Sequence, residues 1–340
     1  MHRNLQDGSC TSCKLTLAIL RPSKGIPMIQ TNAAPLRGIV LKCASVSVFT
    51  VMAALVKATS IGDVPVPPGQ QVFFRSFFAL PVILLWLVFR SELRVGLTTF
   101  RPMGHFYRGI VGTAAMGFNF WALSLLAFPE ATAIGYAAPL LVVIFAGMFL
   151  GEDVRAFRLG MVAMGLAGVL IVLSPQLTGV GPSDPAHMLG AVVALMGASC
   201  AALAQIFVRK LVQQERTSAI VFWFSITSTL LSLITLPFGW VMPTGGTLAM
   251  LVLTGVLGGL GQILLTSSYR FADASVVAPF DYASMILAVL IGWTVFGEMP
   301  TRTVLGGASV VILAGILIIW REHKLGLERT RQRRAGTPPG

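Results

Sequence analysis

The feature that most constrains this chain is a series of ten long apolar runs separated by short polar segments. A helix rises about 1.5 Å per residue and the hydrocarbon core of a bilayer is about 30 Å thick, so about 20 apolar residues cross it once. Only 11% of the residues are charged, against roughly 25% in a soluble domain, so the chain cannot make a water-facing surface. The runs lack the alternation of barrel strands, which favours helices. The predicted spans are 38–59, 70–89, 106–126, 131–150, 156–173, 187–208, 219–240, 247–268, 274–296 and 302–320.

Basic residues fall almost entirely in alternate segments between the runs. The segments 60–69, 174–186 and 241–246 contain no Lys or Arg, and of the 25 basic residues only Arg302 lies on their side of the membrane. This is the positive-inside pattern, which predicts that both termini are cytoplasmic and that the number of spans is even. The net charge of +12 therefore reflects the membrane topology and contact of the basic residues with anionic lipid. It is not interpreted as a sign of nucleic-acid binding. The cytoplasmic set between the runs is Arg90, Arg94, Arg101, Arg108, Arg155, Arg158, Arg209, Lys210, Arg216 and Arg270.

The N-terminal segment 1–36 is polar and mixed, and its apolar stretch 15–20 is too short for a signal peptide. Met28 opens a second start directly before the first span, so we hypothesise that residues 1–27 are dispensable or not translated. Cys10 and Cys13 form an isolated CxxC pair, which we interpret as chance spacing rather than a metal or redox site.

An internal repeat divides the rest of the chain. The stretch 131–139, followed by Gly151-Glu152, is similar to 274–282, followed by Gly297-Glu298, at a spacing of about 146 residues. That spacing covers five spans, an odd number, so the second copy crosses the membrane in the opposite sense. Inverted repeats are typical of transporters, in which two halves open a central site to each side in turn. The alternative is a duplicated scaffold that transports nothing. The predicted halves are 37–174 and 187–320, followed by a solvated basic tail, 321–340, without a fold of its own.

The repeated residues resemble a known family. The pattern Glu130-Ala-Thr-Ala…Ala138-Pro139-Leu140…Gly151-Glu152, with Ala278-Pro279-Phe280-Asp281-Tyr282…Gly297-Glu298, is similar to the two EamA-type domains of the drug/metabolite transporter superfamily. The resemblance covers about 37–320. It implies a ten-helix permease whose central cavity is lined largely by spans 1, 3, 4, 6, 8 and 9, in a family that exports amino acids and other metabolites and imports vitamins such as riboflavin.

Ionisable side chains within the spans are few, and each costs roughly 2.5–3.5 kcal/mol to insert. Asp281 in span 9 is predicted to accept a proton or bind the substrate, or alternatively to pair with polar neighbours and fix its span. Arg75 in span 2 offers a charge to an anionic substrate, although snorkelling to the interface is the favoured interpretation. Lys42 and Lys57, at the two ends of span 1, are also interpreted as snorkelling anchors, with Lys57 kept as a binding candidate because span 1 lines the cavity.

Neutral polar and aromatic side chains complete the candidate site. Amides hydrogen-bond as donors and acceptors, and aromatic rings stack on planar solutes, although interhelical hydrogen bonding explains the amides equally well. Pro139 and Pro279 interrupt spans 4 and 9 and are candidate hinges or static bends. Glu152 and Glu298 are expected to cap the helix that follows each of them. The candidate binding residues here are Asn119, Trp121, Tyr136, Gln205, Gln262 and Tyr282.

Catalytic motifs are missing from the sequence. The four histidines, at positions 2, 105, 187 and 323, lie outside the spans or at their ends, and no HExxH, P-loop or GxSxG is present. We therefore expect a secondary carrier of the bacterial inner membrane that needs no metal or cofactor and is not an enzyme, with a membrane-embedded enzyme as the rival class. Its partners would be a small-molecule substrate and the lipid bilayer. Riboflavin uptake is the first substrate hypothesis, and export of amino acids, other metabolites or drugs is the alternative.

Overall fold

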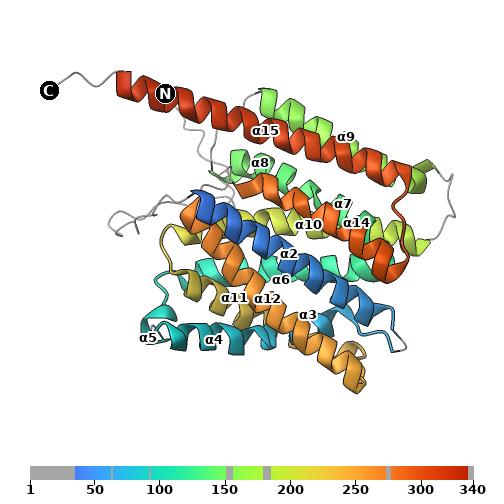
Figure 1. The fold of residues 1–340 in the computed structure, drawn as a ribbon. Coiled ribbons are helices and arrows are strands. Elements are labelled where there is room, and N and C mark those ends of the chain that lie inside the picture. The colour runs from blue at the N-terminus through green and yellow to red at the C-terminus, as the bar shows by residue number, and fades with distance from the viewer. Residues whose placement is uncertain are drawn as a thin grey trace, which may run out of the picture.

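The computed structural model describes residues 35–62, 64–91, 93–150, 156–178, 185–272 and 277–335. Within these ranges the chain is helical and contains no β-strand, as the sequence predicts. Six helical stretches are long and apolar enough to cross a membrane, judged by length and composition, and three shorter helices are also apolar. They stack side by side in one bundle (Figure 1).

The helices follow the predicted runs in order. The first five runs correspond to α2 (Pro35–Ser60), α3 and α4 (Pro68–Phe77 and Ala79–Phe89), α6 (Pro102–Leu125), α7 and α8 (Phe128–Gly135 and Ala137–Leu150), and α9 (Ala156–Thr178). The second five correspond to α10 (Pro185–Val212), α11 (Thr217–Leu233), α12 (Gly245–Phe271), the 3₁₀ helix η2 with α14 (Ala278–Tyr282 and Ala283–Phe296), and α15 (Arg302–Ala335). The short α5 (Leu93–Gly96) and the 3₁₀ helix η1 (Leu236–Phe238) lie in connections.

Prolines decide where several of these helices end. A proline lacks the N–H that would bond the carbonyl four residues earlier, and its ring clashes with that carbonyl. Accordingly, α3 ends at Phe77, four residues before Pro81, and α7 ends at Gly135, four residues before Pro139. The predicted interruption of span 4 is therefore present. Pro279 instead lies in the first turn of η2, where its missing N–H breaks no helical bond.

Two predicted boundaries are wrong. Span 7 was expected over 219–240, but α11 ends at Leu233, again four residues before a proline, Pro237. The tail was expected to have no fold, but α15 continues to Ala335, because Leu, Glu, Lys and Arg are strong helix formers and no proline follows until Pro338.

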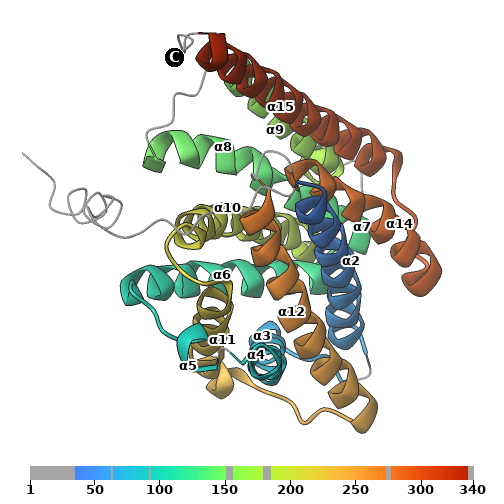
Figure 2. The ribbon, with the colours of Figure 1, turned by 60° about the vertical axis from the view of Figure 1, so that its left-hand side comes forward.

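Helices from the two halves of the chain pair extensively. α2 packs along α12 and α6 along α10, while α3 contacts α11 and α7 contacts α14. α9 and α15 run together along one edge of the bundle, and α3, α4, α11 and α12 form the opposite edge (Figures 1 and 2). Gly168 and Gly307 allow the α9–α15 contact, since a Cβ on either would lie within 3 Å of the other's carbonyl oxygen.

Candidate functional site

Two tyrosines from opposite halves meet where their helices are interrupted. Tyr136 occupies the break between α7 and α8, and Tyr282 ends η2. Their rings pack edge to face with centroids 5.1 Å apart, and both side chains are buried. The Tyr136 hydroxyl donates to the Tyr282 carbonyl at 3.3 Å and hydrogen-bonds the Ser284 hydroxyl at 2.8 Å. Interrupted helices that meet between two halves are where secondary transporters place their binding sites.

An ion pair joins α2 to η2 on one side of this tyrosine junction. Lys42 Nζ lies 2.7 Å from Asp281 Oδ1 and donates to the Tyr269 hydroxyl at 3.5 Å. The Lys42 side chain is only 2% exposed, whereas the Asp281 side chain is 30% exposed. The snorkelling interpretation of Lys42 is therefore wrong, because a buried ammonium needs a partner and finds it on the other half of the chain.

A second ion pair joins the other end of α2 to the segment that follows α14. Lys57 Nζ lies 2.8 Å from Glu298 Oε1 and donates to the Leu126 carbonyl at 2.6 Å. The second oxygen of Glu298 accepts a 2.6 Å hydrogen bond from the Phe128 N–H, at the start of α7. Glu298 thus caps a helix of the first half instead of the helix that follows it, which corrects that prediction. The snorkelling interpretation of Lys57 is also wrong, since its side chain is buried. Glu152 lies outside the described residues.

A third polar contact lies near this second pair. His187 Nε2, on α10, is 2.9 Å from Glu130 Oε2, in the first turn of α7. Together with the Lys57–Glu298 pair, it joins α2, α10 and the connection after α14 to the start of α7.

The remaining predicted residues are spread over other helices. Asn119 on α6 and Gln205 on α10 are half-buried, and Gln262 on α12 is buried beside Gly261, whose carbonyl accepts a 2.9 Å hydrogen bond from Ser45 on α2. Trp121 is exposed, so it is not part of the buried tyrosine junction. The structure therefore brings Asp281, Tyr282 and Tyr136 together with Lys42, and it pairs Lys57 with Glu298 at the other end of α2. None of the described contacts joins the amides or the tryptophan to either group.

No group of three metal-ligating side chains occurs among the residues that the structure describes. Cys10 and Cys13 lie outside those residues. The chemistry of the site is thus that of paired charges, phenols and interrupted backbone.

Comparisons with known proteins agree with this arrangement. The model of the EamA-like transporter family matches residues 36–174 and 188–321, which is most of the chain and both of its halves. The chain belongs to the EamA-like transporter family.

Curated relatives of this EamA-like transporter carry different substrate names. One from Rhizobium johnstonii, named riboflavin transporter, is 33% identical over 76% of this chain and 83% of its own. One from Rickettsia bellii, named S-adenosylmethionine uptake transporter, is 30% identical over 75% of this chain and 84% of its own. One from Pseudomonas aeruginosa, named pseudopaline exporter CntI, is 28% identical over 83% of this chain and 95% of its own. A solved crystal structure shares the fold with a TM-score of 0.60 at 20% identity, over 85% of this chain and 98% of that one. The chain is therefore a multi-pass transporter of the inner membrane.

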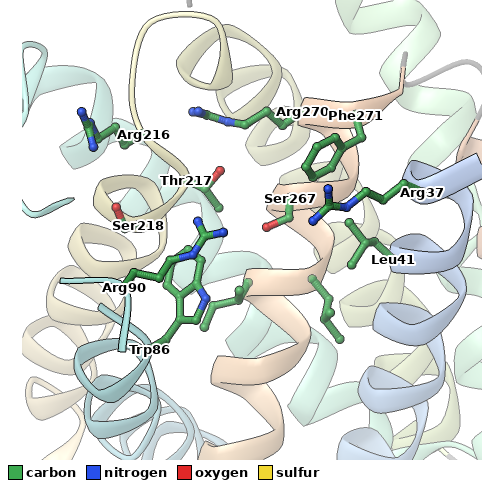
Figure 3. A pocket seen from close by; sticks show the side chains of 12 residues that line it. Arg37, Leu41, Trp86, Arg90, Arg216, Thr217, Ser218, Ser267, Arg270 and Phe271 are labelled. Atoms are coloured by element: carbon green, nitrogen blue, oxygen red, sulfur yellow. The ribbon is translucent and has the colours of Figure 1, made fainter. Parts of the chain in front are cut away.

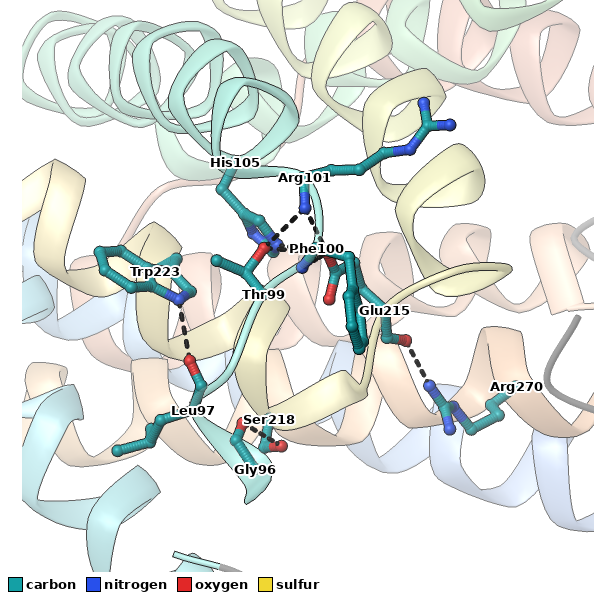
Figure 4. A network of polar contacts seen from close by, with 10 residues as sticks. All are labelled: Gly96, Leu97, Thr99, Phe100, Arg101, His105, Glu215, Ser218, Trp223 and Arg270. Atoms are coloured by element: carbon teal, nitrogen blue, oxygen red, sulfur yellow. Dashed lines mark hydrogen bonds and ion pairs between the residues drawn. The ribbon is translucent and has the colours of Figure 1, made fainter. Parts of the chain in front are cut away.

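The transporter has a polar network at the α10–α11 connection that the sequence did not indicate (Figure 4). Glu215 Oε1 accepts hydrogen bonds from the Thr99 hydroxyl and from the backbone N–H groups of Phe100 and Arg101, just before α6. Its carbonyl accepts a 2.6 Å bond from Arg270 at the end of α12. Burial raises the pKa of the Glu215 carboxyl, but the neighbouring His105 and these donors outweigh burial and lower its pKa below the ordinary value.

A basic pocket of about 460 Å³ lies between the ends of α2, α4, α11 and α12 (Figure 3). In the figure, the guanidinium groups of Arg37, Arg90 and Arg270 and the hydroxyls of Thr217 and Ser267 surround the same space. The guanidinium carbon of Arg90 lies 5.2 Å from the ring centroid of Trp86, and that of Arg37 lies 4.3 Å from the ring centroid of Phe271.

Two further arginines of the transporter are buried inside the bundle. Arg75 on α3 and Arg108 on α6 are 3% and 5% exposed. The snorkelling interpretation of Arg75 is therefore wrong, and Arg108, counted with the cytoplasmic basic residues between the runs, is instead buried within α6. The sequence held one signal for Arg108, which is that it falls inside the predicted span 106–126.

Proposed function

We propose that this EamA-like transporter is a ten-span secondary carrier with both termini in the cytoplasm. It moves a small organic metabolite across the inner membrane by alternating access between two inverted halves, 37–174 and 187–320. The helix pairing supports the inverted repeat. If each helix of one half exchanges with its counterpart in the other, the α2–α12 pair becomes the α10–α6 pair, and the α3–α11, α7–α14 and α9–α15 pairs return to themselves.

The observation that carries the alternating-access proposal is the pair of ion pairs along α2. Lys42 and Lys57 are 15 residues apart, which is about 22 Å of helical rise, and each pairs with an acid of the other half. Tyr282 of the tyrosine junction lies in the chain segment between those two acids. One ion pair therefore closes each end of the interface between the halves, and a carrier that opens to one side at a time has to separate one of them while the other holds.

Paired cysteines test this role of the ion pairs. The variants are Lys42→Cys with Asp281→Cys and Lys57→Cys with Glu298→Cys, each in a background in which the native cysteines are replaced by serine. Cross-linking with a cleavable bifunctional thiol reagent, whose spacer replaces the length of the lysine side chain, is expected to stop transport in proteoliposomes in both variants, and reductive cleavage to restore it. Undiminished transport in a fully cross-linked variant would contradict the proposal. The single-cysteine variants are the matched controls.

Riboflavin uptake is the first substrate to test, because one curated relative bears that name. The measurement is growth rescue of a riboflavin auxotroph that lacks its own uptake system, at low external riboflavin. Absence of rescue at normal expression rejects riboflavin. S-adenosylmethionine uptake and solute export, named for other relatives, are the alternatives in the same panel. Turnover of a membrane substrate without solute movement would favour the rival class, a membrane enzyme.

A further inference from the structure

The two buried arginines lie on the same aromatic ring. The guanidinium carbon of Arg108 is 3.9 Å from the centroid of Phe224 on α11, and that of Arg75 is 5.4 Å from it. Within the described part of the chain, the guanidinium of Arg75 donates one long hydrogen bond, to the Gly258 carbonyl at 3.4 Å. Among the buried nitrogens, Nε and Nη1 of both arginines have no hydrogen-bond partner. Cation–π contact alone compensates a buried cation only in part.

None of the acidic side chains that the structure describes neutralises the two arginines. The structure describes the side chains of four acidic residues, and each is engaged elsewhere: Asp281 with Lys42, Glu298 with Lys57, Glu130 with His187, and Glu215 with the start of α6. By sequence, the other Asp and Glu residues lie outside the ten predicted spans. Two positive charges are thus buried together without a counter-charge among the described side chains, an arrangement that normally costs several kcal/mol.

Both arginines point toward the middle of the bundle instead of its ends. Arg108 lies six residues inside α6, about 9 Å from the first residue of that helix, and Phe224 lies at a similar depth, about 10 Å into α11. Arg75 enters from the opposite end, about 10 Å into α3. If the two side chains snorkelled, they would extend toward opposite faces of the membrane and away from each other. These two converge on one ring, each about two helical turns from the first residue of its own helix.

Glycines make room for the two guanidinium groups. A Cβ on Gly112 would lie 2.0 Å from Nη1 of Arg108, and one on Gly258 would lie 2.8 Å from Nε of Arg75. Gly112 follows Arg108 by one helical turn and Gly258 belongs to the facing α12. Any side chain at either position would displace an arginine, so the sequence leaves space for the charges at this point.

We propose that Arg75 and Arg108 bind the anionic group, a carboxylate or a phosphate, of the solute that the transporter carries. Planar guanidinium groups match the oxygens of such groups with paired, charge-assisted hydrogen bonds. The bound oxyanion supplies the missing counter-charge. The proposal rests on the proposed transport function and narrows its substrate class, since riboflavin itself carries no carboxylate or phosphate.

Matched ligand pairs test the proposal on the purified full-length protein in an uncharged detergent. The pairs differ only in the anionic group: S-adenosylmethionine and its decarboxylated form, riboflavin 5′-phosphate and riboflavin, histidine and histamine. At least one anionic member is expected to raise the unfolding temperature saturably, and its partner is expected to bind at least about tenfold more weakly. If no member with the anionic group stabilises the protein, or if the members without that group do so equally, the proposal is wrong.

The variants are Arg75→Gln and Arg108→Gln, with Arg302→Gln as a matched control at an exposed arginine. Both test variants are expected to lose the response to the anionic ligand and to unfold, without ligand, at the same or a higher temperature than the unaltered protein. A merely structural arginine would instead leave the ligand response in place and lower the unfolding temperature. Gly112→Ala provides a second route, because it displaces the Arg108 guanidinium and leaves both charges. Riboflavin transport that survives both arginine changes would keep the transporter proposal and reject the anion site.

A separate observation, the basic pocket at the ends of α2, α4, α11 and α12, carries a second proposal. Its lining combines the apolar side chains of Leu41, Ile263 and Leu264 with four arginines, Arg37, Arg90, Arg216 and Arg270. α12 contacts both α2 and α4, which also line the pocket. With the proposed topology the pocket faces the cytoplasmic leaflet, which is rich in anionic lipid. We infer that it binds the phosphate of an anionic phospholipid, whose acyl chains contact the apolar side chains.

Phosphatidylglycerol is therefore expected to raise the unfolding temperature of the delipidated protein more than phosphatidylcholine does. The double variant Arg37→Gln with Arg90→Gln is expected to abolish that difference, and Arg302→Gln to preserve it. Equal stabilisation by soluble glycerol 3-phosphate would assign the pocket to a free phosphate ligand and overturn the lipid proposal. Equal effects of the two lipids would also overturn it.

Discussion

At the scale of single residues, the basic side chains buried in the bundle differ in whether they have a partner of opposite charge. Lys42 and Lys57 each have a carboxylate partner across the interface between the halves, whereas Arg75 and Arg108 share an aromatic ring and have no carboxylate partner among the described side chains. A buried charge with a partner holds structure together, and one without a partner is retained at a cost. The lysines are therefore expected to govern stability and closure, and the arginines to govern ligand binding.

The Lys57–Glu298 pair gives a first prediction. Lys57→Met alone leaves the Glu298 carboxylate without its cation and is expected to lower the free energy of unfolding by about 2 kcal/mol, a figure reduced from the value for fully buried pairs because Glu298 is partly exposed. Adding Glu298→Gln to the Lys57→Met variant should recover part of that loss. The measurement is a double-mutant cycle by thermal unfolding in detergent. Additive single effects would show that the two side chains are not coupled.

Glu215 gives a second prediction. Its folded-state pKa is lowered, so the carboxylate contributes stability that is fully present above the ordinary value of about 4.3 and is lost as the pH falls through the folded-state pKa. Glu215→Gln is expected to cost about 1–3 kcal/mol at neutral pH, because it weakens hydrogen bonds to the start of α6. The difference from the unaltered protein should shrink as the pH falls below about 4. Thermal unfolding from pH 7 to pH 3.5 measures it, with the exposed Gln213→Ala as the control; a difference that does not change with pH would contradict it.

At the scale of helices, prolines divide elements that hydropathy reads as continuous. α3, α7 and α11 each end four residues before a proline. A proline in α9 has the opposite outcome. Pro175 lies inside that helix, and the Ser174 hydroxyl donates a 2.8 Å hydrogen bond to the carbonyl of Ile171, the one that the proline leaves without its N–H. The break before Pro139 is the one that places Tyr136 at the interface with Tyr282.

Pro139→Ala gives the third prediction. The alanine N–H can bond the carbonyl of Gly135, so α7 and α8 are expected to join and the unfolding temperature to stay equal or rise. If the break is a hinge, transport in proteoliposomes should fall several-fold. Pro81→Ala, which joins α3 to α4 away from the tyrosine junction, is the matched control and should leave the rate nearly unchanged. Unchanged transport in Pro139→Ala would make the break a static bend.

At the scale of the whole molecule, the same helix pairs recur when the halves are exchanged, and polar contacts between halves lie on both sides of the tyrosine junction. Such an arrangement gives two similar closed interfaces, one toward each face of the membrane. Alternating access requires that they differ little in energy, since each has to open in turn.

The topology gives the fourth prediction. Because the segments 60–69, 174–186 and 241–246 lack Lys and Arg, single cysteines placed in them are expected to react with an impermeant thiol reagent added outside intact cells. Cysteines in 213–216 and beyond residue 335 should react only after the cells are opened. Labelling of the chain's C-terminal end from outside would overturn the proposed orientation.

The sequence by itself determined the helical class, the ten runs, the charge bias and the division into two similar halves, because apolar length and charge are properties of local segments. It also marked Asp281, Tyr282, Tyr136 and Lys57, because ionisable and aromatic residues stand out in apolar surroundings. Only the tertiary structure decided which partner each one meets. Glu298 caps α7 and pairs with Lys57, Arg108 turns inward to Phe224, and Glu215 holds the start of α6. Those contacts join residues far apart in the chain, and their energies depend on burial and distance, which a single sequence does not specify.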